Sequence, residues 1–163
     1  MDRRTVWVNY EYYTKNWLER ANRTENEDYI DIIDKFISLW IAFNGWMKNT
    51  FGEGATDRKL IEYAIEHPPM QEVFSDLQKN NAEFGASLER LGGYRIVGTK
   101  ESLYLYDGSL SSLLEFLYQV RCNLFHGRKD TVDRDLDIIR DSFQVLIVLF
   151  EDYLSKNEGD WHF

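Results

Sequence analysis

The chain has 163 residues, which is the length of one domain with room for a sizeable core, and its hydrophobic content of 44% excludes a disordered chain. A formal net charge of −9 argues against a protein that coats nucleic acid indiscriminately by neutralising phosphates. The N-terminus lacks the apolar region of a signal peptide, no apolar stretch approaches the roughly 20 residues that cross a bilayer, and a single cysteine permits no intrachain disulfide, so we expect a cytoplasmic protein without membrane association.

The first half of the chain has helical periodicity. The N-terminal aromatic stretch around Trp17 and Leu18 is expected to form a helix laid over the bundle. Residues 26–49 predict a long helix that ends at the glycines of "FGEG". Its expected inner stripe consists of Ile30, Ile33, Ile37, Trp40, Ile41 and Phe43. Residues 56–67 predict a short helix, capped by Thr56 and stopped by Pro68.

The second half continues the pattern. Residues 70–91 predict one bent helix or two short ones, and residues 92–108 predict a short hairpin or an ordered loop near 94–107. A helix over 109–125 has a possible capping box from Ser112 to Glu115 and buries Leu113, Leu114, Leu117 and Val120. The last helix, 134–156, is expected to bury Leu136, Ile139, Phe143, Leu146, Ile147 and Phe150. The predicted fold class is all-α, with residues 1–163 forming a single helical bundle.

The stretch "QVRCNLFHGRKD" ends the helix over 109–125 with side chains suited to phosphate chemistry. Arg121 carries a permanent charge on a planar fork that matches phosphate oxygens, and His126 can give or take a proton near neutral pH. Asn123 lies three residues before His126 and can orient it, while Arg128 and Lys129 add local positive charge for binding a substrate. The alternative is structural, because cations and polar residues are also common at the C-terminal ends of helices.

Two other kinds of site have less support. Cys122 and His126 are i, i+4 neighbours, but a catalytic thiolate is disfavoured at a helix C-terminus, so packing is the preferred role for Cys122. The three histidines and one cysteine make no recognised metal-ligand spacing, and no glycine-rich phosphate loop is present. We therefore expect neither a metal site nor a cofactor.

Arg121 to His126 forms an Arg-x4-His motif that ends one helix ahead of another in an all-α bundle. This motif, with its "LFHG" ending and the earlier "LWIAFN", resembles the HEPN superfamily (higher eukaryotes and prokaryotes nucleotide-binding domains), most closely its Apea-like and related bacterial branches. The resemblance is strongest over residues 28–154. It implies that Asn44 faces the motif and contributes to substrate binding. A tyrosine that one antitoxin-neutralised branch carries two places after the histidine is Arg128 here, so that arrangement is not carried over.

Many HEPN proteins are metal-independent RNases. The resemblance therefore implies an RNA endonuclease that acts as a homodimer with a composite site, serves in phage defence or stress response as a toxin, and has a possible antitoxin or regulatory protein as partner. From the residues, Arg121 would stabilise charge on the phosphate, while His126 would serve as acid or base, with Asn123 beside it. The alternative is a non-catalytic helical dimer that binds RNA, nucleotide or a protein and keeps only the shape of the motif.

Overall fold

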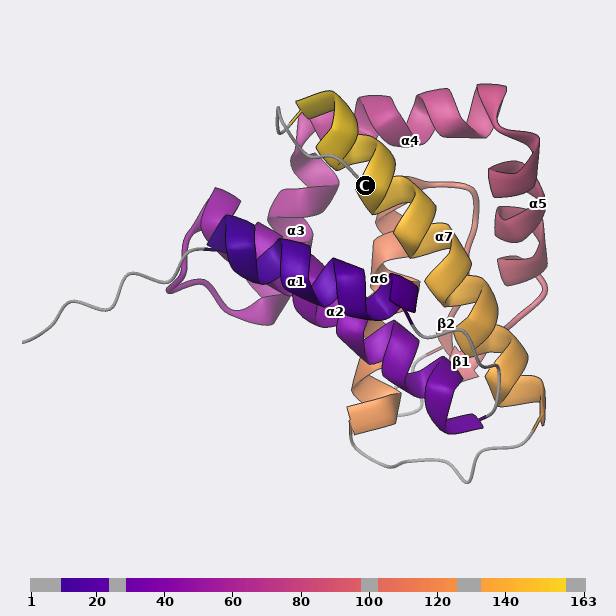
Figure 1. Ribbon diagram of the computed structural model, residues 1–163. Coiled ribbons are helices and arrows are strands. Elements are labelled where there is room, and N and C mark those ends of the chain that lie inside the picture. Colours follow the sequence, from indigo (N-terminus) through magenta and orange to yellow (C-terminus); the bar gives the residue numbers. More distant parts are fainter. Residues whose placement is uncertain (1–9, 24–28, 98–102, 126–132, 158–163) are drawn as a thin grey trace, which may run out of the picture.

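A computed structural model describes residues 10–23, 29–97, 103–125 and 133–157. In these ranges the chain forms seven helices and one short hairpin, as Figure 1 shows. The elements are α1 (Tyr10–Arg23), α2 (Tyr29–Phe51), α3 (Asp57–Glu66), α4 (Pro68–Asn80), α5 (Ala82–Leu91), β1 (Ile96–Val97), β2 (Leu103–Tyr104), α6 (Leu110–Phe125) and α7 (Asp133–Asn157). The prediction of an all-α bundle is confirmed. None of the described helices is long and apolar enough to cross a bilayer.

Local signals set most of the helix boundaries. The Thr56 side chain accepts a hydrogen bond from the backbone N–H of Lys59 and caps α3, as predicted. Gly52 follows α2 with φ of +123°, a left-handed conformation that glycine adopts at little cost. Residues 70–91 belong to two helices, because the extended Asn81 ends α4 and its side chain caps α5 through the N–H of Phe84.

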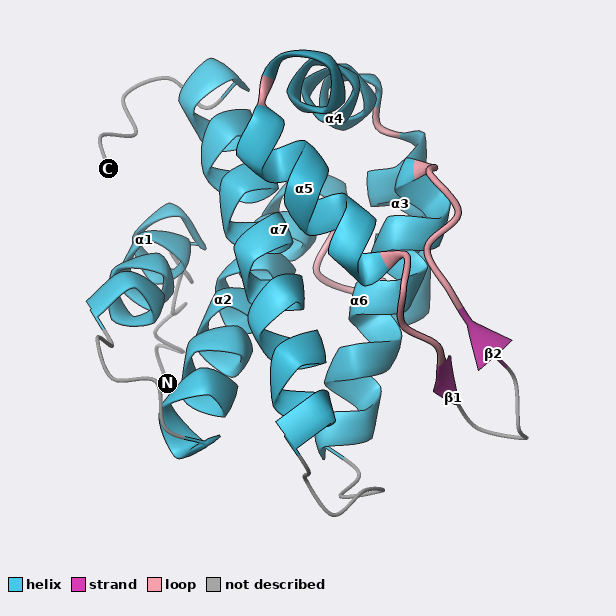
Figure 2. Ribbon diagram, turned by 90° about the vertical axis from the view of Figure 1, so that its right-hand side faces the viewer, coloured by secondary structure: helices cyan, strands magenta, loops and turns pink. Residues whose placement is uncertain are grey.

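α1 packs along α2 on a strip of small residues. Ser38, Ala42 and Gly45 recur at helical spacing on α2 and are all buried. The Thr14 hydroxyl of α1 donates to the Ala42 carbonyl at 3.4 Å, and a Cβ added at Gly45 would lie 2.8 Å from the ring of Tyr13. Small side chains thus let the two helices approach closely, and α1 lies on the outer side of α2 (Figure 2).

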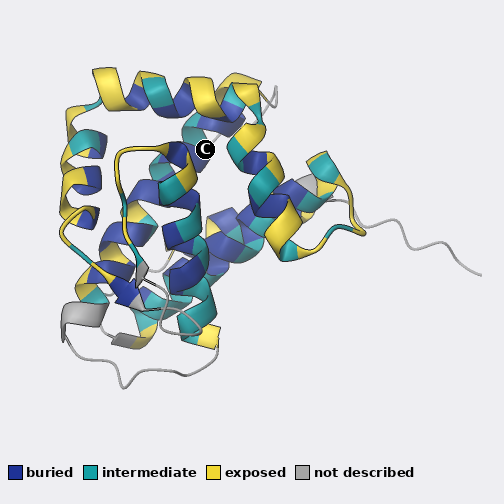
Figure 3. Cartoon of the chain, turned by 180° about the vertical axis from the view of Figure 1, so that it is seen from behind, coloured by how far each residue is buried: buried dark blue, intermediate teal, exposed yellow. Residues whose placement is uncertain are grey.

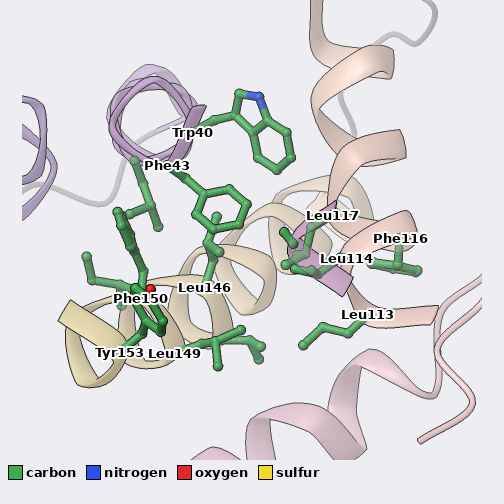
Figure 4. Packing of buried hydrophobic residues seen from close by; sticks show 14 of the residues in the cluster. Trp40, Phe43, Leu113, Leu114, Phe116, Leu117, Leu146, Leu149, Phe150 and Tyr153 are labelled. Atoms are coloured by element: carbon green, nitrogen blue, oxygen red, sulfur yellow. The ribbon is translucent and has the colours of Figure 1, made fainter. Parts of the chain in front are cut away.

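The core lies where α2, α6 and α7 face one another. Phe43 of α2 packs edge-to-face on Phe150 of α7, with ring centroids 5.3 Å apart, and stacks on Trp46 at 5.6 Å. Figure 4 shows Phe43 and Phe150 beside Leu146 and opposite the leucines of α6. Buried positions line the inner faces of the helices and exposed positions lie outside (Figure 3). The four side chains predicted to be buried on α6 (Leu113, Leu114, Leu117 and Val120) are buried.

The segment near residues 94–107 contains a hairpin. β1 and β2 pair antiparallel, with Ile96 opposite Tyr104 and Val97 opposite Leu103. The two strands contact α6, on the side of the bundle away from α1 (Figure 2). The hairpin therefore leaves the helical architecture intact.

Three details of the predicted helices are wrong. Of the inner stripe predicted for α2, Trp40 and Phe43 are buried, but Ile33, Ile37 and Ile41 are only partly buried and Ile30 is 72% exposed. Burial on that helix also follows Ile32, Phe36 and Leu39, which were not predicted. Ser112 does not start a capping box with Glu115, because α6 begins earlier. Ser109 caps it by accepting from the N–H of Ser112 at 3.0 Å. On α7, Leu136 and Phe143 are only partly buried, while the other four predicted positions are buried.

Candidate active site around Arg121

Arg121 lies near the C-terminal end of α6, opposite the start of α3. Its Nη2 is 3.6 Å from Oδ2 of Asp57, the first residue of α3, and 24% of its side chain is exposed. A second ion pair, between Arg58 and Glu115, also joins the first turn of α3 to α6. Leu60 and Ile61 are fully buried, which anchors α3 in the core. The packing of α3 in the core thus places the Asp57 carboxylate beside Arg121.

Asn44 of α2 reaches the same carboxylate. Its Nδ2 donates to Oδ1 of Asp57 at 3.2 Å, whereas Arg121 contacts the other oxygen. The structure therefore brings two of the sequence-predicted residues, Asn44 and Arg121, to one place through a third that was not predicted. Asp57 directly follows a helix cap, where an acidic residue is ordinarily explained by the helix dipole. That sequence signal gave no reason to connect Asp57 with the motif.

The guanidinium of Arg121 also contacts two neighbours on its own helix, Phe125 and Cys122. Its central carbon lies 4.4 Å from the ring centroid of Phe125, one helical turn later, in a cation–π contact. Nη1 lies 3.9 Å from Sγ of Cys122, which is a weak acceptor. Among the described residues, the buried Nε of Arg121 has no hydrogen-bond partner. Four of the five N–H donors of a guanidinium are on Nη1 and Nη2, and the weak contacts of these two atoms at 3.9 Å and 3.6 Å leave donors for an anion.

Tyr118 adds a neutral phenol to this cluster. Burial raises the pKa of Tyr118, and the nearby Cys122 and the Asp57 carboxylate raise this pKa further, while Arg121 opposes them. The Tyr118 ring also lies 6.1 Å from the ring of Trp40. Because the pKa is raised above that of an ordinary tyrosine, the Tyr118 hydroxyl keeps its proton at neutral pH. Sequence reasoning missed this residue, since one tyrosine on a helix carries no distinctive pattern.

Asn123 lies on a different side of α6. Residues two positions apart on a helix are separated by about 200° around its axis, so Asn123 and Arg121 point to different sides of α6. The Asn123 side-chain oxygen accepts a hydrogen bond from Nε2 of the buried Gln119 at 2.7 Å. Asn123 is thus not part of the group formed by Asn44, Asp57 and Arg121.

The other predicted site residues, His126, Arg128 and Lys129, lie outside the described residues, as does Gly127. α6 ends at Phe125, the residue directly before His126. Within the described ranges, no three or more His, Cys, Asp or Glu side chains are grouped so that they could hold a metal ion.

Comparison of the chain with protein-family models, with curated proteins and with solved structures finds no match.

Proposed function

We propose that this protein is a metal-independent RNA endonuclease that acts as a homodimer, with Arg121 and His126 of both chains in a shared site. The observation that carries the proposal is the state of Arg121. Its side chain is 24% exposed, its central carbon lies over the ring of Phe125, and its Nη2 is 3.6 Å from Asp57, so N–H donors of the terminal nitrogens remain for an anion. A planar fork with donors to spare is suited to a phosphate group.

The proposed reaction uses the 2′-hydroxyl of RNA as an internal nucleophile. A base removes the proton of that hydroxyl, the oxygen attacks the phosphorus, and an acid protonates the departing 5′-oxygen. Negative charge grows on the phosphorane oxygens meanwhile, and Arg121 stabilises it. The products are a 2′,3′-cyclic phosphate and a 5′-hydroxyl.

A homodimer supplies both the base and the acid. Each chain offers one His126, whereas a two-fold axis places the same surface of two chains face to face and so brings two histidines together. Arg128, Lys129 and Asn44 are proposed to bind the RNA, and Asn123 to orient His126. The resemblance to HEPN proteins extends the proposal to a cytoplasmic toxin in phage defence or stress response, with an antitoxin or regulatory protein as a further partner.

A second candidate is a non-catalytic dimer that binds RNA, a nucleotide or a protein through the same surface. The observation that favours it is the ion pair between Arg121 and Asp57, which already compensates part of the arginine's charge. Such a protein would bind RNA without changing it.

One experiment separates the two candidates. Purified protein is incubated with total RNA in the presence of EDTA, alongside the His126→Ala variant and a His162→Ala control that removes a histidine elsewhere in the sequence. We expect cleavage by the wild-type chain and by the control, and none by His126→Ala. Chemical mapping should find 2′,3′-cyclic phosphate and 5′-hydroxyl ends. Products with 3′-hydroxyl ends, or complete inhibition by EDTA, contradict the proposed mechanism, and intact RNA with wild-type protein favours the second candidate.

A further inference from the structure

We infer that Asp57 is a positioning residue of this site: it fixes the direction of the Arg121 guanidinium from a carboxylate that Asn44 holds in place. The inference rests on the proposed function, because positioning matters only if Arg121 acts on a phosphate. This role explains why an acidic side chain lies beside the arginine proposed to bind phosphate, although its negative charge repels RNA.

The Asp57 carboxylate is itself well fixed. Asn44 donates to Oδ1 at 3.2 Å, so the side chain is tied to α2 as well as to its own helix. As the first residue of α3, Asp57 also lies at the positive end of that helix dipole. The cap of α3 is Thr56, so the helix start does not depend on Asp57. Asp57 therefore contributes to α3 only through the helix dipole, and its contacts with Asn44 and Arg121 go beyond that contribution.

The contact of Asp57 with Arg121 is weak, although the position of the carboxylate is fixed. Nη2 lies 3.6 Å from Oδ2 of Asp57, beyond the usual range of an N–H to oxygen hydrogen bond. The guanidinium contacts the ring of Phe125 on α6 and the carboxylate of Asp57 on α3, and these two contacts together limit its orientation. A closer, bidentate pair would occupy two of the N–H donors, whereas this spacing leaves them for a phosphate.

Positioning and simple competition predict different kinetics. If Asp57 positions Arg121, its loss misplaces the donor in the transition state and lowers kcat, since a misplacement of about 1 Å can cost roughly 10²-fold. The Michaelis constant for RNA should stay the same or fall, because a negative charge near the phosphate is removed. If Asp57 only competes with RNA for Arg121, its loss should instead raise kcat/KM.

The test compares Asp57→Asn with Asp57→Glu and with a matched control. The control, Glu83→Gln, neutralises an exposed acidic residue in the first turn of α5, and so matches the change in charge and in helix-dipole interaction. We expect Asp57→Asn to lower kcat about 10- to 100-fold with an unchanged or lower KM, Asp57→Glu to recover part of the loss, and Glu83→Gln to behave as wild type. An unchanged or higher kcat in Asp57→Asn overturns the inference.

A measurement without cleavage separates this inference from the proposed function. In a double-mutant cycle, the urea unfolding midpoints of Asp57→Asn, Arg121→Met and the double variant report whether the two side chains interact. We expect the shifts to be non-additive. Additive shifts overturn the link between Asp57 and Arg121 even if the protein cleaves RNA. A wild-type chain that cuts no RNA overturns the proposed function, and with it the kinetic role of Asp57, whatever the cycle shows.

Discussion

Replacing Arg121 with methionine tests whether this arginine serves the function or the stability of the protein. Methionine keeps an unbranched stem that can still contact Phe125, but it removes the charge and every donor. The variant loses an ion pair with Asp57 worth about 0.2–1 kcal/mol and a cation–π contact worth about 0.5–1 kcal/mol. It also removes the buried Nε for which the described residues offer no acceptor, a group whose burial costs about 1–3 kcal/mol.

These opposing terms nearly cancel. We expect the free energy of unfolding of Arg121→Met to lie between about 1 kcal/mol below and about 2 kcal/mol above that of the wild type. Urea denaturation followed by circular dichroism measures it directly. For an arginine that only closes a helix end, no unfavourable burial offsets the lost contacts, so its replacement lowers the free energy of unfolding.

Arg90 provides a matched comparison. Its Nε donates to the nearly buried Asp141 at 3.0 Å and its Nη2 donates to Ser87 at the same distance. Arg90→Met therefore leaves a nearly buried carboxylate with one donor fewer, and should cost about 1–3 kcal/mol. If Arg121→Met destabilises the protein as much as Arg90→Met does, the reasoning about Arg121 is refuted.

Four further predictions concern the same region. Arg121→Lys should cleave RNA nearly as poorly as Arg121→Ala, on the order of 10²–10³ below wild type in single-turnover assays, because lysine lacks the bidentate fork; a rate near that of wild type means that only diffuse charge matters. Cys122→Ser should keep most of the activity, since the thiol is assigned to packing, and an inactive but folded serine variant revives a Cys122–His126 pair. In dimers formed from random mixtures of wild-type and His126→Ala chains, activity should follow the square of the wild-type fraction, whereas a straight line, with subunit exchange confirmed, means that one histidine suffices at each site. Because the pKa of Tyr118 is raised in the folded chain, the tyrosine loses its proton first in the unfolded chain as pH rises through about 10, so the free energy of unfolding should fall above that pH. Tyr118→Phe should make this fall less steep in urea denaturation at alkaline pH. An unchanged slope contradicts a raised pKa of Tyr118.

The helices could be predicted because their signals are local. The cap at Thr56, the left-handed Gly52 and the apolar periodicity of α6 and α7 act over a few residues, so the sequence alone contains them. The errors arose where a choice depends on distant parts of the chain. Ile30 fits the apolar period of α2 as well as Ile33 does. Whether each side chain is buried depends on which other helices pack against that turn of α2, and only tertiary packing decides this.

The candidate site was predictable only in part for the same reason. Arg121 and Asn123 stood out because they fall within one motif, and Asn44 because of a family resemblance. Asp57 meets Arg121 only after α3 packs against α6, and Tyr118 gains its raised pKa only from burial in the folded chain. A sequence shows which groups are present, whereas the electrostatic environment of each group depends on the fold.

The way α1 rests on the bundle has a consequence for exchange of backbone hydrogens with solvent. α1 packs mainly against α2, while α2 also contacts α3 and α7. Detaching α1 breaks its contacts along Ala42 and Gly45 and the hydrogen bond from Asn22 to Glu151, but leaves the aromatic core around Phe43 and Phe150 closed. Amides of α1 can therefore exchange by a local opening, whereas those deep in α7 must wait for the whole bundle to open. We therefore expect slower hydrogen exchange in α7 than in α1.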